Sequence, residues 1–181
     1  LAPWVITLLY SSAFEPAVSL LQWQMVGNVF KLASWALAFS IIAAARGTTF
    51  LLMELSFNIV FLGMVFVFLP HVGLEVTAFA FVLGYLVYLT IVYVLARSIH
   101  SFRWQTLSLC LLGLHTSLGV ALLVLALMAP FAAAIASPLL AAATGLFGLR
   151  IVLSKVGKHG RLPTRLYVIF ERLGWPIQSA V

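Results

Sequence analysis

A stripe of polar residues runs along one face of an otherwise apolar segment near the start of the chain. Its members recur at spacings of three and four residues: Gln24, Gly27, Asn28, Lys31, Ser34 and Trp35. This spacing places side chains on one face of a helix. A lysine on such a face could bind an anionic substrate; the structural alternative is a lysine that bonds neighbouring carbonyl groups.

Lys31 is the most informative member of the stripe because of its depth. It lies near the midpoint of the apolar segment 16–45, too far from either end for its side chain to reach water easily. A lysine at the centre of a bilayer costs roughly 2.5–3.5 kcal/mol on insertion scales, and charged residues at that depth mark substrate or ion pathways. The sequence therefore predicts a substrate site at Lys31, with Gln24, Asn28 and Trp35 beside it.

Glu54 is the second charged candidate, and Asn58 follows it one turn later on the same helical face. A helix rises 1.5 Å per residue, so Glu54 lies about 10 Å along the helix axis from a turn near Gly47, and Lys31 lies about 24 Å from the same turn. A direct ion pair is therefore not expected, and Asn58, at about 16 Å, comes closer to the lysine. Glu54 has two interpretations, a group that couples transport to an ion and a solvated carboxylate at a helix start.

Two further residues are candidates with open alternatives. Tyr88 shares a face with Tyr85 and Gly84, and this face could accept a sugar or could serve only for aromatic packing. His115 lies in the middle of an apolar segment, where a histidine can couple proton movement or can bond a neighbouring carbonyl. Asn58 and Tyr88 are predicted among the substrate contacts, and Glu54 and His115 as coupling residues.

The composition excludes most soluble functions. Hydrophobic residues make up 64% of the 181 residues and charged residues 8%, whereas soluble domains carry about 25% charge. The single cysteine, Cys110, excludes a disulfide framework and a cysteine-rich metal site. No nucleophile elbow, phosphate-binding loop or paired-histidine motif is present. The sequence predicts a membrane protein that is not an enzyme, with no metal and no cofactor.

The elements that must position these residues are membrane-spanning helices. Apolar stretches of full length are predicted at residues 16–45, 49–69, 74–96, 106–128 and 131–153. Residues 1–10 are apolar but too short to span a bilayer, so we expect the chain to begin inside a longer protein, near the end of a further helix. Barrel strands are excluded because residues 121–128 are apolar at every position rather than alternating. We expect an all-α transmembrane bundle over residues 1–153.

The basic residues predict the orientation of this bundle. Nine of the ten lysines and arginines end or follow the first, third or fifth predicted segment: Arg46, Arg97, Arg103, Arg150, Lys155, Lys158, Arg161, Arg165 and Arg172. Because basic loops stay in the cytoplasm, these loops and the tail 154–181 are predicted to be cytoplasmic. The net charge of +6 then reflects topology and contact with anionic lipids, and no nucleic-acid partner is expected.

The tail contains a short amphipathic helix, predicted at residues 162–173. Its apolar residues share one face, which is expected to lie on the cytoplasmic leaflet: Leu162, Leu166, Ile169, Phe170 and Leu173. Gly174 and Pro176 supply the stop signal. A frayed tail is the alternative, since helices this short are marginal in isolation.

Several stretches together resemble a known family of transporters. They are residues 2–10, 20–28 and 31–35, with Phe14, Ala17, Glu54 and Leu55, followed by Leu69, Pro70 and Gly73 and a segment with Tyr85, Tyr88 and Tyr93. This pattern resembles the C-terminal lobe of bacterial lipid-linked oligosaccharide flippases, the O-antigen and enterobacterial common antigen translocases of the multidrug/oligosaccharidyl-lipid/polysaccharide exporter superfamily. The similarity is strongest over residues 1–97.

The resemblance implies a fold and an activity. Two pseudo-symmetric six-helix lobes would enclose a central cavity, and this chain would hold the last part of the second lobe, so that a missing N-terminal lobe is an implied partner. The implied activity is translocation of an undecaprenyl-diphosphate-linked oligosaccharide across the bacterial inner membrane, for assembly of O-antigen or a related surface polysaccharide. A polysaccharide polymerase complex is a further implied partner. By position, Lys31 would engage the diphosphate-sugar.

Two other functions stay open. A drug or cation exporter of the same superfamily would favour acidic rather than basic residues in the cavity. A membrane scaffold of a glycan-assembly complex, without transport activity, would not need the polar stripe.

Overall fold

The computed structural model describes residues 17–44, 46–157, 161–172 and 174–177, and every regular element within them is a helix. The helices are α2 (Ala17–Ala43), α3 (Gly47–Val72), α4 (Glu75–His100), α5 (Thr106–Met128), α6 (Pro130–Val156) and α7 (Arg161–Arg172). The all-α prediction is confirmed. The partial helix predicted at residues 1–10 lies outside the described residues.

Four helical stretches are long and apolar enough to cross a membrane: Ala17–Ala43, Gly47–His100, Thr106–Met128 and Pro130–Val156. The second is 54 residues long and consists of α3 and α4, which meet at a turn that contains Gly73. The length and composition of these helices fit a multi-pass membrane protein.

Three helices extend beyond their predicted ends: α3 past residue 69, α4 past residue 96 and α6 past residue 153. Helix α3 continues through Pro70 and ends at Val72. Gly73 caps it, with a φ of 72° that favours glycine and an N–H that donates to Leu69 O. A proline near the end of a helix removes only one backbone bond, so it did not stop the helix. Helix α4 runs to His100 through residues that are polar but compatible with a helix; their polarity indicates the edge of the membrane rather than the end of the helix.

The chain divides into two compact units, Leu1–Ala134 and Ile135–Val181. The first contains α2 to α5 and the start of α6, and the second contains the rest of α6 and α7. The division therefore falls within α6, before the boundary at residue 153 that the sequence predicts.

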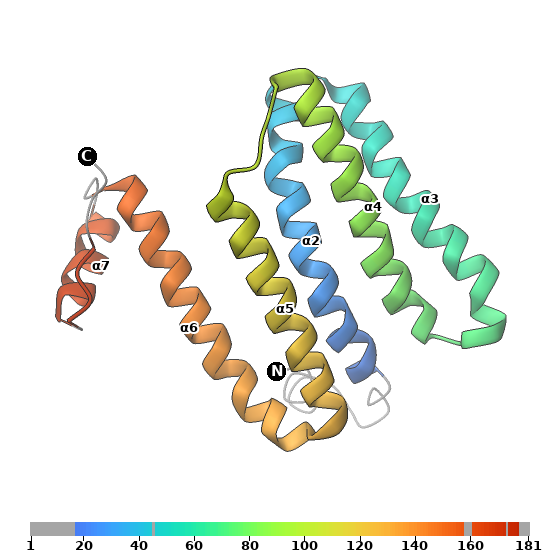
Figure 1. Ribbon diagram of the computed structural model, residues 1–181. Coiled ribbons are helices and arrows are strands. Elements are labelled where there is room, and N and C mark those ends of the chain that lie inside the picture. The colour runs from blue at the N-terminus through green and yellow to red at the C-terminus, as the bar shows by residue number, and fades with distance from the viewer. Residues whose placement is uncertain (1–16, 45, 158–160, 173, 178–181) are drawn as a thin grey trace. The chain divides into compact units, whose positions relative to one another are not determined.

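Helix α4 forms the centre of the first unit. It packs against α2 on one side and α3 on the other, while α5 lies along α2 (Figure 1). The main core lies among α2, α3 and α4 and includes Leu37, Ile41, Met53, Tyr88 and Val92. These three helices contribute the stripe, Glu54 and Tyr88, so this core positions most of the candidate residues.

Two glycines permit close approach of the helices within this core. A Cβ atom on Gly27 would lie 2.6 Å from Cδ1 of Phe81, so α2 meets the Phe81 ring at a position that has no room for a side chain. On α4, a Cβ on Gly84 would lie 2.9 Å from Cε2 of Phe57. Small residues at helix contacts are the usual means by which membrane helices approach closely.

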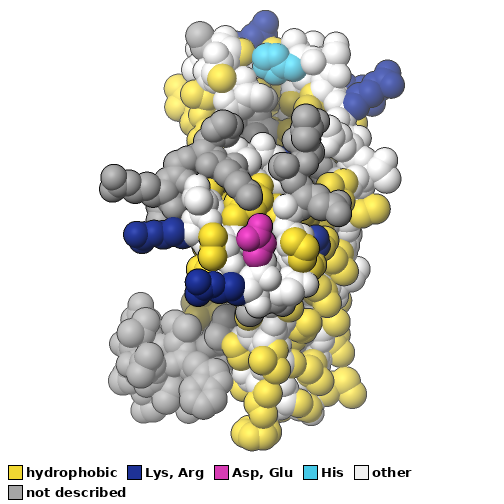
Figure 2. Space-filling model, turned by 90° about the vertical axis from the view of Figure 1, so that its left-hand side faces the viewer, with side chains coloured by type: hydrophobic (Ala, Val, Ile, Leu, Met, Phe, Trp, Pro, Cys, Tyr) yellow, Lys and Arg dark blue, Asp and Glu magenta, His cyan; other side chains and the backbone are white. Residues whose placement is uncertain are grey.

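Large apolar side chains cover much of the remaining surface. On α3, for example, Leu51, Ile59 and Phe66 are exposed. Figure 2 shows one face of the chain, on which apolar side chains are abundant and acidic ones scarce. Exposed apolar surface of this extent is expected where lipid is the solvent.

In the second unit, α7 packs against α6 through a small core that contains Leu153, Tyr167 and Phe170, with Leu149 and Leu166 beside it. The hydroxyl of Tyr167 donates a 2.8 Å hydrogen bond to Leu153 O. The amphipathic helix is present as α7, and two residues of its predicted leaflet face, Leu166 and Phe170, pack against α6. Both contribute to packing on α6, because burial against a neighbouring helix satisfies an apolar stripe as well as lipid does.

Candidate functional site between α2, α3 and α4

Lys31 lies on α2 with its ammonium group enclosed by aromatic rings. Its Nζ is 4.8 Å from the ring centroid of Trp35, 5.5 Å from that of Tyr85 and 5.8 Å from that of Phe81. All three distances lie within the range of a cation–π interaction. Trp35 follows Lys31 by one helical turn, whereas Phe81 and Tyr85 come from α4. We call these three residues the aromatic cage.

The cage holds the ammonium group without neutralising its charge. Among the described residues, Nζ of Lys31 has neither an ion pair with a carboxylate nor a hydrogen bond with a carbonyl; only the backbone oxygen of Lys31 is bonded, by Ser34 Oγ at 2.7 Å. Cation–π contacts leave the full positive charge in place. Within the described part of the chain, no carboxylate therefore compensates the charge of this ammonium group.

Glu54 projects from α3 toward the same helices. Its Oε1 accepts a 2.6 Å hydrogen bond from the hydroxyl of Tyr88 on α4. Tyr88 is only 1% exposed, so the bond is shielded on the tyrosine side and restrains the half-buried carboxylate. Tyr88, predicted among the substrate contacts, is buried in this structure and its hydroxyl is bonded to Glu54.

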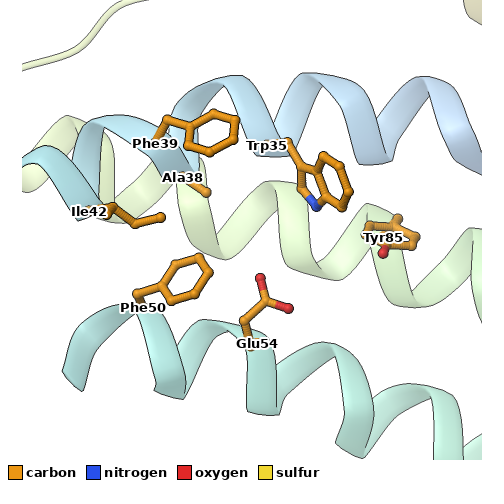
Figure 3. A pocket seen from close by; sticks show the side chains of 7 residues that line it. All are labelled: Trp35, Ala38, Phe39, Ile42, Phe50, Glu54 and Tyr85. Carbon is orange, nitrogen blue, oxygen red and sulfur yellow. The ribbon is translucent and has the colours of Figure 1, made fainter. Parts of the chain in front are cut away.

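A pocket of about 380 Å³ lies beside these groups, lined by Trp35, Ala38, Phe39, Ile42, Phe50, Glu54 and Tyr85. Figure 3 shows Trp35 extending from α2 and Glu54 from α3, so that the indole and the carboxylate project toward the space between the two helices. Lys31 does not line the pocket, but Trp35 and Tyr85 contact Lys31 and also form part of the pocket wall. The ammonium group and the carboxylate thus flank one aromatic surface.

The other predicted residues lie apart from this surface or contribute indirectly. Asn58 Nδ2 donates to the backbone oxygen of Glu54 at 2.8 Å, a bond within α3. Gln24 and Asn28 are half-buried on α2, further toward its N-terminus than Lys31. His115 is on α5, where its Nδ1 lies 2.8 Å from Leu111 O in the same helix. The structure therefore brings Lys31, Trp35, Glu54 and Tyr88 together and leaves His115 outside.

Sequence reasoning missed three aromatic residues of the site. Phe81 closes the cage from α4, and Phe39 and Phe50 form pocket walls. One signal was present, because Phe81 precedes Tyr85 by one turn and Tyr88 by two, on the face that contains Gly84. Phe39 and Phe50 carry no comparable signal, since single phenylalanines are common throughout an apolar chain.

The arrangement can bind a charged, partly apolar group. A fixed cation, a fixed carboxylate and exposed aromatic surface are features of a recognition site. Among the described residues there is also no cluster of His, Cys, Asp and Glu that could hold a metal ion. Comparison with protein-family models, curated proteins and solved structures finds no match.

Proposed function

We propose that this chain is part of a bacterial inner-membrane translocator that binds the diphosphate-sugar head of a lipid-linked oligosaccharide between α2, α3 and α4. The substrate class is the undecaprenyl-diphosphate-linked oligosaccharide used for O-antigen or a related surface polysaccharide. One observation carries the proposal: the ammonium group of Lys31 lies on a helix long and apolar enough to span a membrane, packed against aromatic rings and without a carboxylate partner among the described residues.

The physical argument starts from the cost of moving a charged head group. A diphosphate cannot cross about 30 Å of hydrocarbon without compensation for its lost hydration. A fixed ammonium group midway offers part of that compensation. Its attraction must stay moderate, because a head group that binds too tightly cannot leave. The aromatic cage satisfies this condition, because it holds the lysine in place without adding a second positive charge. The substrate would then be attracted by one cation only.

The aromatic surface supports the sugar part of the proposal. Trp35 is 42% exposed and lies between Lys31 and the pocket. Indole rings combine a large apolar face with a polar N–H group, which suits a sugar ring that has apolar C–H faces and polar edges. A head group bound at Lys31 would therefore place its first sugar against Trp35.

The test is binding of undecaprenyl diphosphate to the protein in lipid nanodiscs, with undecaprenol as the uncharged comparison. Lys31→Ala should weaken diphosphate binding about 10- to 100-fold, because hydrogen bonds to charged groups contribute about 1.5–3 kcal/mol, and should leave undecaprenol binding unchanged. Lys155→Ala is the matched control, since Lys155 is exposed near the end of α6. Equal effects of the two substitutions would contradict the proposal.

A second function, export of an organic cation, is favoured by the pocket itself. Glu54 is the only charged residue in its lining, and the rest of the wall is aromatic or aliphatic. Carboxylates and aromatic faces together attract lipophilic cations. Under this function the ammonium group of Lys31 would compete with the substrate for the aromatic surface.

The two functions predict opposite responses to the same pair of variants. For a cation exporter, Glu54→Gln should weaken binding of tetraphenylphosphonium and Lys31→Ala should strengthen it. For the lipid-linked substrate, Lys31→Ala should weaken binding of undecaprenyl diphosphate, and Glu54→Gln should not. Glu75→Gln, at the exposed start of α4, is the matched control for the carboxylate. A membrane scaffold without transport activity should bind neither probe.

A further inference from the structure

Helix α7 has two different faces, and only one of them packs on α6. Leu166, Tyr167 and Phe170 belong to the core with α6. The opposite face is exposed and combines two arginines with two large apolar residues: Arg165, Val168, Ile169 and Arg172. At 3.6 residues per turn these four positions fall on one side of the helix. Val168 is 42% exposed and Ile169 is 50% exposed.

The packing of α7 on α6 places this exposed face beside the last turns of α6. Helix α6 has 27 residues, so it is about 40 Å long and exceeds the hydrocarbon thickness of about 30 Å. The contacts of α7 fall on Leu149 and Leu153, in the last turns of α6. These turns also carry Arg150 and Lys155, which indicates that they reach the lipid head groups.

The segment after α7 is held at the same level. Nη2 of Arg150 donates to Pro176 O at 3.0 Å, and its guanidinium group lies 4.7 Å from the ring centroid of Trp175. Trp175 also contacts Phe170, with a centroid separation of 6.0 Å. Tryptophan is enriched at the boundary between hydrocarbon and water, so its position agrees with the depth inferred from α6.

From the geometry of this face we infer that α7 docks on the anionic phospholipids of the adjacent leaflet through Arg165, Val168, Ile169 and Arg172. The arginines bind head-group phosphates, and the two aliphatic side chains enter the boundary between head groups and acyl chains. On a face that contacts only water, Val168 and Ile169 would expose apolar surface without a partner. On a face buried in hydrocarbon, the two arginines would lose their hydration. The unit contains a single acidic residue, Glu171, so its charge complements an anionic surface.

The experiment measures the depth of this face in the intact protein. A nitroxide label is attached to a single cysteine at Ile169, with Cys110 replaced by alanine, and the protein is reconstituted in phosphatidylcholine vesicles with or without phosphatidylglycerol. Collisions with oxygen report contact with lipid, and collisions with a nickel chelate report contact with water. We expect the label to be exposed to oxygen and protected from the chelate only when phosphatidylglycerol is present.

Charge variants test the role of the arginines. Each basic residue near an anionic surface contributes about 1 kcal/mol, so Arg165→Gln with Arg172→Gln should lower the ratio of docked to undocked helix roughly 25-fold. High salt should have the same effect, while Arg165→Lys with Arg172→Lys should retain docking. Arg97→Gln with Arg103→Gln, two exposed arginines elsewhere, is the matched control and should change nothing.

Three results would overturn the inference. The first is a label open to the chelate in both kinds of vesicle, which would mean that the face meets only water. The second is a label protected from both reagents, which would mean that another protein surface covers it. The third is a label immersed to the same depth with and without phosphatidylglycerol, which would show that anionic lipid is not required.

Discussion

The hydroxyl of Tyr88 on α4 lies 2.6 Å from Glu54 Oε1 on α3 and donates a hydrogen bond to it. The bond joins two helices that otherwise meet through apolar contacts, and Tyr88 is almost fully buried. The same carboxylate lines the pocket together with Trp35 and Tyr85. The two opposite charges of the site thus flank one aromatic surface, since Lys31 contacts the same two rings.

The first prediction concerns this bond. Tyr88→Phe should lower the stability of the protein by roughly 1.5–3 kcal/mol, because it removes a shielded hydrogen bond to a charged group. Tyr93→Phe is the matched control; Tyr93 is on the same helix and contacts Phe102 and Trp104 through its ring. Thermal unfolding in detergent measures both. Equal losses for the two variants would show that the hydroxyl of Tyr88 contributes nothing specific.

The second prediction concerns the close contact of α2 with α4. Gly27→Ala should destabilise the protein by about 1–3 kcal/mol, since the new methyl group would lie 2.6 Å from Cδ1 of Phe81 and 3.3 Å from Cα of Val82. Gly63→Ala meets no atom within 4 Å and should leave stability unchanged or slightly higher. Thermal unfolding again distinguishes them, and an unchanged midpoint for Gly27→Ala would contradict the packing described.

The third prediction concerns orientation in the membrane. In a Cys110→Ala background, cysteine at His71 should react with an impermeant thiol reagent in intact cells, whereas cysteine at Ser101 should react only after lysis. Both positions are exposed, so a difference in labelling would reflect the side of the membrane. Equal labelling of the two in intact cells would refute the predicted orientation.

The long apolar helices could be predicted from the sequence, because the hydropathy of a segment indicates whether that segment can lie in lipid. The predicted segment 106–128 coincides with α5 (Thr106–Met128). The predicted helix ends are wrong where the apolar residues stop before the helix does. At the end of α4, for example, the last residues are mostly polar but still helical. Polarity indicates where the lipid ends, and a helix can continue into water.

The face of α7 was harder to predict, because a helical wheel shows which residues are apolar but not what covers them. The wheel groups Ile169 with Phe170, yet Phe170 is buried against α6 while Ile169 is exposed. Only the position of α6 distinguishes the two. In a chain this apolar, the contrast between a core face and a lipid face is too small to read from composition.

The site was predicted in part. Lys31 and Glu54 stand out because charge is rare and costly in such segments, and both lie at the aromatic surface. Phe81 and the supporting role of Tyr88 were not predicted. An aromatic residue in an apolar helix gives the same signal whether it packs in a core, faces lipid or encloses a cation.

The fourth prediction tests the central claim, that Lys31 binds the diphosphate head during translocation. Its measurement is export of lipid-linked oligosaccharide in a strain that lacks its own flippase and carries the gene encoding this chain. Lys31→Ala should abolish export at normal membrane abundance of the protein. Lys31→Arg should retain part of it, because a guanidinium group keeps the charge and also stacks on aromatic faces. Full export by Lys31→Ala at normal abundance would contradict the claim.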